Sequence, residues 1–140
     1  MTPKEYLLKY QDAVNRANAA MRHLEKLREM TTRITPNYGS IGISSHQTGD
    51  KLGDAVAKMI DAESRVSDEI EMLTATEREV TKTIVSIEDS VLRILLYEKY
   101  INCRSWEEVS VIIHYSRYHT THILHPRALE MVKLALESTL

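Results

Sequence analysis

The sequence predicts an all-α protein, in which a long antiparallel helical hairpin, resembling a coiled coil, precedes a C-terminal three-helix domain. Helix-breaking residues are scarce, with four Gly and three Pro among 140 residues. Apolar side chains recur every three or four residues over two long stretches, which is the spacing of amphipathic helices. The hydrophobic fraction of 43% is enough to fill a core, so these helices are expected to pack together.

The first helix is expected to begin at Thr2-Pro3-Lys4-Glu5. Thr2 and Glu5 can form a capping box, and proline suits the first position of a helix. An apolar stripe then continues to residue 34, which predicts one helix of about nine turns. Its members are Tyr10, Val14, Ala17, Met21, Leu24, Leu27, Met30 and Ile34.

A polar stretch rich in Gly, Ser and Thr predicts a loop over residues 35–49, pinned by Ile41 and Ile43. Asp50 is expected to cap a second, longer helix. Its stripe repeats every 3.5 residues, as in a coiled coil, so the two helices are expected to pair as an antiparallel hairpin. The stripe comprises Leu52, Val56, Met59, Glu63, Val66, Ile70, Leu73, Glu77, Val80, Ile84, Ile87, Val91 and Ile94.

Two glutamates interrupt that stripe. Glu63 and Glu77 are 14 positions apart, about 21 Å along a helix, so they cannot act on one substrate. We expect them either to mark where the stripe meets water or to set the register of the hairpin. In the second case they would pair with Arg16, Arg22 or Lys26.

The polar triplet Glu88-Asp89-Ser90 predicts a boundary between a hairpin domain, residues 1–89, and a C-terminal domain, residues 90–140. Asp89 or Ser90 can cap a new helix over residues 91–101. A helix that continues through the triplet is the alternative.

The C-terminal domain contains a helix-turn-helix pattern. Ser105-Trp106-Glu107-Glu108 is a second capping box, His114-Tyr115 forms a turn, and Ser116 caps the next helix. The first of these helices is expected to bury Trp106, Val109, Ile112 and Ile113, and the second to bury Thr120, Ile123, Leu124, Ala128 and Met131. Pro126 predicts a kink or break in the second helix, because proline lacks an N–H and crowds the carbonyl four residues earlier.

The open side of the second helix carries the candidate site. Arg117 can form a bidentate pair with guanine, and the hydroxyl of Thr121 can contact a base or a phosphate. The full candidate set for DNA contact is Arg117, Tyr118, Thr121 and His122, with Arg104 and His125 for phosphate. Residues 91–140 carry six Lys/Arg, five Asp/Glu and four of the six histidines, so the charge balance favours DNA only slightly.

These residues also carry a family resemblance. The runs LLYEKYIN at 95–102, SWEEV at 105–109, YSR at 115–117 and RAL at 127–129 resemble region 4 of sigma-70-type factors. More closely, they are similar to phage and prophage helix-turn-helix regulators of Gram-positive hosts, including the ArpU-like late regulators. The run GDKLGDAVAK at 49–58 also resembles that group, so the likeness spans residues 4–133. The resemblance implies DNA binding in phage gene control.

Three positions depart from the family pattern. Cys103 stands where such sequences usually have glycine, so Asn102 is expected to supply the left-handed turn instead. Thr120 replaces an apolar core residue, and Pro126 falls inside the recognition helix. The basic face is thin, and one copy alone would bind DNA weakly. A homodimer formed through the hairpin, or recruitment by RNA polymerase, is therefore expected.

Other classes of function are disfavoured. No nucleophile with a base, acid pair or nucleotide motif appears, which argues against an enzyme and a cofactor. His119, His122 and His125 have ligand-like spacing, but no Cys or carboxylate completes a metal site. Cys103 is the only cysteine, and no apolar run approaches ~18 residues, so we expect a cytoplasmic protein without a membrane span. The family resemblance implies that the cell is a bacterial host. The rival functions are an adaptor that binds RNA polymerase or a phage protein, and a structural helical phage protein.

Overall fold

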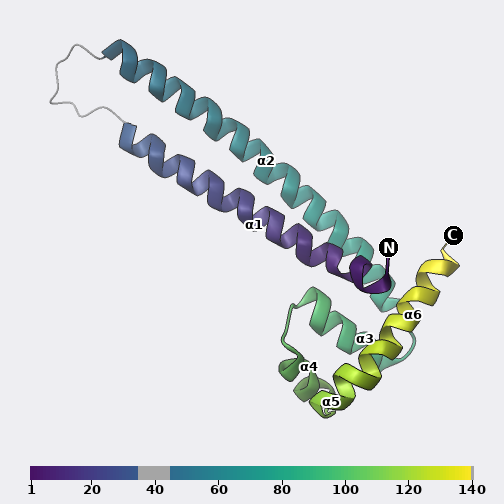
Figure 1. Ribbon diagram of the computed structural model, residues 1–140. Helices are drawn as coiled ribbons and strands as arrows, with labels where there is room; N and C mark the ends of the chain where they lie inside the picture. The colour runs from purple at the N-terminus through teal and green to yellow at the C-terminus, as the bar shows by residue number, and fades with distance from the viewer. Residues whose placement is uncertain (35–44, 140) are drawn as a thin grey trace. The chain divides into compact units, whose positions relative to one another are not determined.

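The computed structural model describes the backbone of residues 1–34 and 45–139, and within these residues every regular element is a helix. The all-α prediction is therefore confirmed. Figure 1 shows the order of the helices along the chain. They are α1 (Pro3–Ile34), α2 (Ser45–Val85), α3 (Ser90–Leu96), the π-helical turn η1 (Tyr97–Ile101), α4 (Trp106–Ile113), α5 (Arg117–His119), the π-helical turn η2 (Thr120–Leu124) and α6 (His125–Ser138).

The first helix begins as predicted. The Glu5 amide donates to the Thr2 hydroxyl over 3.1 Å, and the Thr2 amide donates to the Glu5 carboxylate over 2.9 Å. The predicted start of the second helix at Asp50 is wrong, because residues 45–49 are already helical. Most of the predicted loop, including Ile41 and Ile43, lies outside the described residues.

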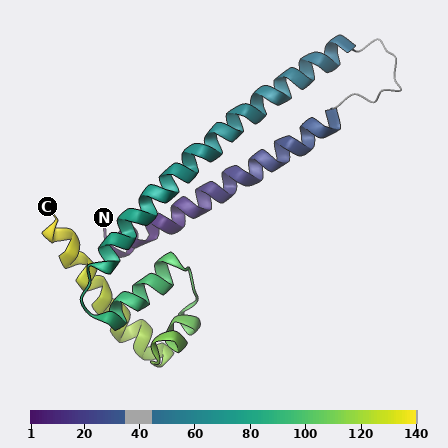
Figure 2. The same ribbon diagram turned by 180° about the vertical axis from the view of Figure 1, so that it is seen from behind.

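The chain divides into two compact units. We call Asn15–Met72 the hairpin unit, and Met1–Val14 together with Leu73–Leu140 the C-terminal unit. Both long helices therefore contribute to both units. In each unit α1 and α2 run side by side in opposite directions, as Figures 1 and 2 show.

Small side chains form the interface of the hairpin unit. Ala17, Ala20 and Ala62 are buried there, which lets the two helices approach closely. Two ion pairs join the helices, Arg16 to Glu69 at 3.5 Å and Arg28 to Glu63 at 3.7 Å. Glu63 does pair across the hairpin, but with Arg28 and not with one of the three predicted partners.

The predicted stripe was wrong at Ile70, whereas Glu63 and Glu77 mark where the stripe meets water, which was one of the two expectations for them. Glu63, Ile70 and Glu77 are exposed, while Ala62 and Thr76, the neighbours of the two glutamates, are buried. The cause is the size of the interface residues. An alanine or threonine fits between two close helices, whereas the larger neighbour turns toward water.

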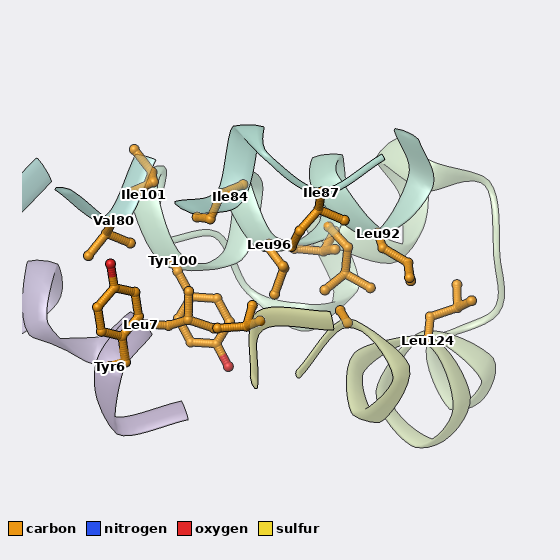
Figure 3. Packing of buried hydrophobic residues seen from close by; sticks show 14 of the residues in the cluster. Tyr6, Leu7, Val80, Ile84, Ile87, Leu92, Leu96, Tyr100, Ile101 and Leu124 are labelled. Atoms are coloured by element: carbon orange, nitrogen blue, oxygen red, sulfur yellow. The ribbon is translucent and has the colours of Figure 1, made fainter. Parts of the chain in front are cut away.

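The core of the C-terminal unit draws on distant parts of the sequence. Tyr6 and Leu7 of α1 and Val80 and Ile84 of α2 join one buried cluster with the C-terminal helices (Figure 3). From those helices the cluster includes Leu92, Leu95, Leu96, Tyr100, Ile101, Val109, Ile113, Leu124, Ala128 and Val132. A hydrogen bond of 2.8 Å between the hydroxyls of Tyr6 and Thr83 fixes α1 against α2 in this unit.

A turn separates α2 from α3, so the alternative of one continuous helix is excluded. Asp89 caps α3 by accepting a 3.0 Å hydrogen bond from the Leu92 amide. The predicted boundary at residue 89 falls in this turn, yet the buried cluster extends across it to Tyr6 and Leu7. A division into domains 1–89 and 90–140 stays a prediction.

Pro126 does not break the last helix, because residues 117–138 are helical without interruption. The π-helical turn η2 ends two residues before the proline, and the amide of the intervening His125 donates to the Thr120 carbonyl, five residues back. This wider turn leaves room for the proline ring, which would crowd the His122 carbonyl in a regular α-helix.

The turn before α4 contains a strained residue. Cys103 has a φ of 55°, whereas Asn102 keeps a right-handed conformation with a φ of −83°. The expectation that Asn102 supplies the left-handed position is therefore wrong. The Cβ atom of any residue other than glycine is crowded in this conformation.

We expect Cys103→Gly to raise the free energy of unfolding by about 1 kcal/mol, because glycine relieves the crowding at a small cost in unfolded-chain entropy. Urea denaturation measures the change. Cys103→Ala is the control, since it removes the thiol but keeps the Cβ atom, and it should bring no gain. An equal gain in both variants would assign the effect to the thiol.

Candidate functional site

The helix-turn-helix in the C-terminal unit is built by three local devices. The Ser105–Glu108 capping box starts α4, with the Glu108 amide donating to the Ser105 hydroxyl over 3.2 Å. His114 ends α4 in a left-handed conformation with a φ of 63°. The Ser116 hydroxyl then accepts from the His119 amide over 3.1 Å and starts α5. Both predicted caps are confirmed.

One face of the second helix is fixed in the core. Thr120, Leu124 and Ala128 are buried as predicted. The Thr120 hydroxyl donates to the Ser116 carbonyl over 2.8 Å, so this polar side chain is satisfied in an apolar place. Ile123 and Met131 are each 38% exposed, so the prediction that they are buried is wrong.

A similar correction applies to α4. Ile112 is exposed, while Ser110 takes a buried position and its hydroxyl donates to the Glu107 carbonyl over 2.7 Å. Val109 and Ile113 are buried as predicted, and Trp106 packs at the edge of the cluster. Because α4 is short, a single buried serine redirects one isoleucine toward solvent.

Arg117 lies on the exposed first turn after Ser116, where we predicted it. Its guanidinium donates to the Glu107 carboxylate of α4 over 3.1 Å. The Arg117 side chain is 65% exposed and that of Glu107 is 75% exposed. An ion pair so open to water is worth only about 0.2–1 kcal/mol, so another anion can replace Glu107 at little cost.

Two stacked pairs of aromatic rings lie beside Arg117. The rings of Tyr118 and His122 are 4.3 Å apart between centroids, and those of Tyr115 and His119 are 5.1 Å apart. Each pair lies within 13° of parallel. Tyr118 and His122 were predicted site residues, whereas Tyr115 and His119 were missed. The repeated i, i+4 spacing of Tyr and His was the signal that could have identified both pairs.

Thr121 is held by its own helix. Its hydroxyl donates to the Arg117 carbonyl over 2.9 Å and lies 2.8 Å from the Nδ1 atom of His122. The hydroxyl oxygen can still accept a hydrogen bond, but the hydroxyl proton is already donated to the Arg117 carbonyl. Thr121 is therefore placed to orient the His122 ring.

The exposed position predicted for His125 is wrong. This imidazole is half-buried, stacks on Tyr100 and meets the edge of Trp106 with ring centroids 4.6 Å apart. Its Nε2 atom lies 2.6 Å from the Tyr100 hydroxyl. Burial, with smaller effects from Lys4 and Lys99, lowers the pKa of His125 to about 4. An uncharged ring held between Tyr100 and Trp106 is poorly placed to contact a phosphate.

Arg104 is exposed, but acidic partners surround its guanidinium. It pairs with Glu98 at 2.7 Å and with Glu108 at 3.2 Å. The hydrogen bonds to these two carboxylates raise the pKa of Arg104 above its ordinary value. Arg104 therefore ties η1 to α4 across the turn, and phosphate would have to displace two carboxylates to reach it.

The outer face of α4 is apolar with an acidic rim. Val111 is 71% exposed and Ile112 is 38% exposed. They line a shallow groove of about 350 Å³ with Arg104, Glu107 and Glu108. The helix-turn-helix thus presents two different surfaces, one with Arg, Tyr and His and one with apolar and acidic side chains.

The described helices offer neither a metal site nor a membrane span. Within residues 1–34 and 45–139, no group of three or more His, Cys, Asp or Glu side chains could hold a metal ion. In the same part of the chain, no helix is long and apolar enough to cross a membrane.

Comparison with known proteins adds no relative. No family model, curated protein or solved structure matches the chain.

Proposed function

We propose that the protein is a DNA-binding transcriptional regulator of phage or prophage genes. The helix that begins at Arg117 enters the major groove, and two copies of the chain bind two half-sites. Arg117, Tyr118 and His122 contact the DNA, while Thr121 orients His122. This set differs from the sequence-based one because Thr121 orients His122 and makes no contact of its own, and because His125 and Arg104 are removed.

One observation carries the proposal. The first two turns after the Ser116 cap expose hydrogen-bond donors on one side, while Thr120 and Leu124 hold the other side in the core. The first turns of the second helix are the part that meets base edges and phosphates in helix-turn-helix proteins. Tyr118 is 67% exposed and stands well clear of the core.

The test begins by selecting binding sites from a random-sequence duplex library with the full-length protein. Fluorescence anisotropy on the selected duplex then gives the affinity of the protein at about 50 and about 200 mM salt. We expect the affinity to fall steeply with salt, because phosphate contacts release counterions. Arg117→Ala should weaken specific binding by about 1–3 kcal/mol, as the loss of a guanine contact would.

Two further variants make the result specific. Arg127→Ala removes an exposed arginine from the same helix, outside the proposed contact surface, and should bind nearly as the unchanged protein does. Glu107→Gln releases Arg117 from its ion pair and should bind at least as tightly. Equal affinities of the Arg117→Ala and Arg127→Ala variants would overturn the assignment of Arg117.

The groove on α4 favours a second candidate function, that of an adaptor. Val111 and Ile112 offer apolar surface, and the rim carries Glu107 and Glu108. Such a surface suits a protein partner, for which RNA polymerase or a phage protein are the candidates, and it repels DNA phosphates. The adaptor function predicts no salt-dependent DNA binding, so the same measurement separates the two functions.

A further inference from the structure

The hairpin unit carries a regular array of charges along one side of α2. Cations and anions alternate there at steps of three and four residues, so that each sign recurs every seven residues. We call these six residues the charge array, and they are Lys51, Asp54, Lys58, Asp61, Arg65 and Asp68. It extends about 25 Å along the helix, at 1.5 Å per residue.

Every member of the charge array is exposed, and none has an ion-pair partner within 4 Å among the described residues. Four other charged residues of the same unit do form ion pairs. Arg16 and Arg28 reach Glu69 and Glu63 across the hairpin. The array is therefore not used in holding α1 and α2 together.

The order of charges is complementary to itself when the helix is reversed. Successive charges are separated by three, four, three, four and three residues, and this spacing is the same from either end. When the order is reversed, every positive charge takes the position of a negative one, and the reverse. A second α2 in antiparallel orientation thus places Asp68 opposite Lys51, Arg65 opposite Asp54 and Asp61 opposite Lys58. A twofold axis repeats each contact, which gives six ion pairs from one interface.

Other arrangements of two copies satisfy fewer charges. In a parallel pair each residue meets its own copy, so all contacts join like charges. An antiparallel pair shifted by seven residues keeps four of the six ion pairs and leaves the end charges without partners. The spacing itself matches the two core positions of a heptad, which face each other in antiparallel coiled coils.

The surroundings of the charge array permit close approach. The flanking residues Ala55, Ala57 and Ser64 are small, so they leave room for a second helix beside the charged side chains. A groove of about 450 Å³ runs beside Lys58 and Arg65, and Leu27 and Ala62 contribute apolar lining. A second helix can cover this apolar surface while its charges pair with the array.

We propose that the charge array is a homodimer interface, in which two copies of the chain pair through α2 in antiparallel orientation. The interface supplies the pairing of two copies that the proposed DNA-binding function requires. Because it forms from charges, the dimer dissociates as salt rises. Its formation does not need DNA, so the two proposals can fail separately.

Sedimentation velocity without DNA tests the interface, at about 20 mM and about 1 M salt. We expect a dimer at low salt and a monomer at high salt. Asp61→Lys alone should weaken the dimer at least about tenfold, because the twofold axis turns two attractions into repulsions. Lys58→Asp alone should do the same for the same reason.

The double variant Lys58→Asp with Asp61→Lys is the decisive control. Across the dimer its exchanged charges still face each other and should restore pairing. Within one helix the exchange places like charges four residues apart. The new aspartate at position 58 meets Asp54, and the new lysine at position 61 meets Arg65. If the array acted only within its own helix, the double variant would therefore not be rescued. Circular dichroism checks that all variants remain helical. A monomer at low salt, or a double variant as weak as the single ones, would overturn the proposal.

Discussion

Replacing Leu7 by alanine is expected to lower the free energy of unfolding by about 2–5 kcal/mol, the usual cost of a cavity left by a buried leucine. Leu7 is fully buried in the same cluster as Val80, Ile84 and Leu96. The loss should therefore appear in the helix-turn-helix, although the substitution is in the second turn of α1. Chemical denaturation measures the loss, and amide hydrogen exchange shows where protection falls.

Leu24→Ala is the matched control for this prediction. Leu24 is buried in the same helix, but it belongs to the hairpin unit. Its removal should lower protection around Ala62 and leave the amides of α3 and η1 protected. If Leu7→Ala also left the amides of α3 and η1 unchanged, the first turns of α1 would not be part of the C-terminal core.

Acid is expected to destabilise the protein through His125. Its pKa is about 4 in the folded chain and about 6.5 when unfolded. Above pH 6.5 the ring is neutral in both states, and between 6.5 and 4 the unfolded state binds more protons. Stability is therefore lost as pH falls through this window. Discounted for partial exposure, the loss is about 1 kcal/mol from pH 7 to pH 5, above the range where carboxylates titrate.

Two variants test whether His125 causes this loss of stability with falling pH. His125→Gln keeps a group that can accept from the Tyr100 hydroxyl but cannot titrate, so its stability should be flat from pH 7 to pH 5. Tyr100→Phe removes the 2.6 Å contact but leaves the His125 ring buried. This variant should be less stable at every pH, and its stability should still fall between pH 7 and pH 5. Urea denaturation at several pH values measures all three proteins. The same slope in the His125→Gln variant would assign the acid effect to other groups.

Local signals in the sequence predicted much of the fold. The caps at Thr2, Asp89, Ser105 and Ser116 depend on residues three positions away, and all four form as read. The periodicity likewise located both long helices. The first residue of a helix and the residues that it buries were harder to predict, because the packing partner decides which face of a helix is buried. For this reason Ala62 is buried at the interface between α1 and α2, where the apolar spacing placed Glu63.

The candidate site was predictable only in part. Arg117 and Tyr118 are exposed because the Ser116 cap fixes the phase of the following turns. His125 was misplaced because the π-helical turn η2 takes up one more residue than an α-helical turn, and this shift carries the ring toward Tyr100 and Trp106. No spacing rule for an α-helix contains that extra residue. The partners of Arg104 were hidden because Glu98 lies in a different helical segment.

The sharing of one core by both ends of the chain has a consequence during synthesis on the ribosome. Tyr6 and Leu7 are made first, but Val80, Ile84, Leu96 and Tyr100 of the same cluster follow more than 70 residues later. At about 5–20 residues per second, the amino end waits for several seconds with its apolar side chains uncovered. The first turns of α1 therefore stay uncovered until these later residues have been made, which gives a chaperone time to bind them.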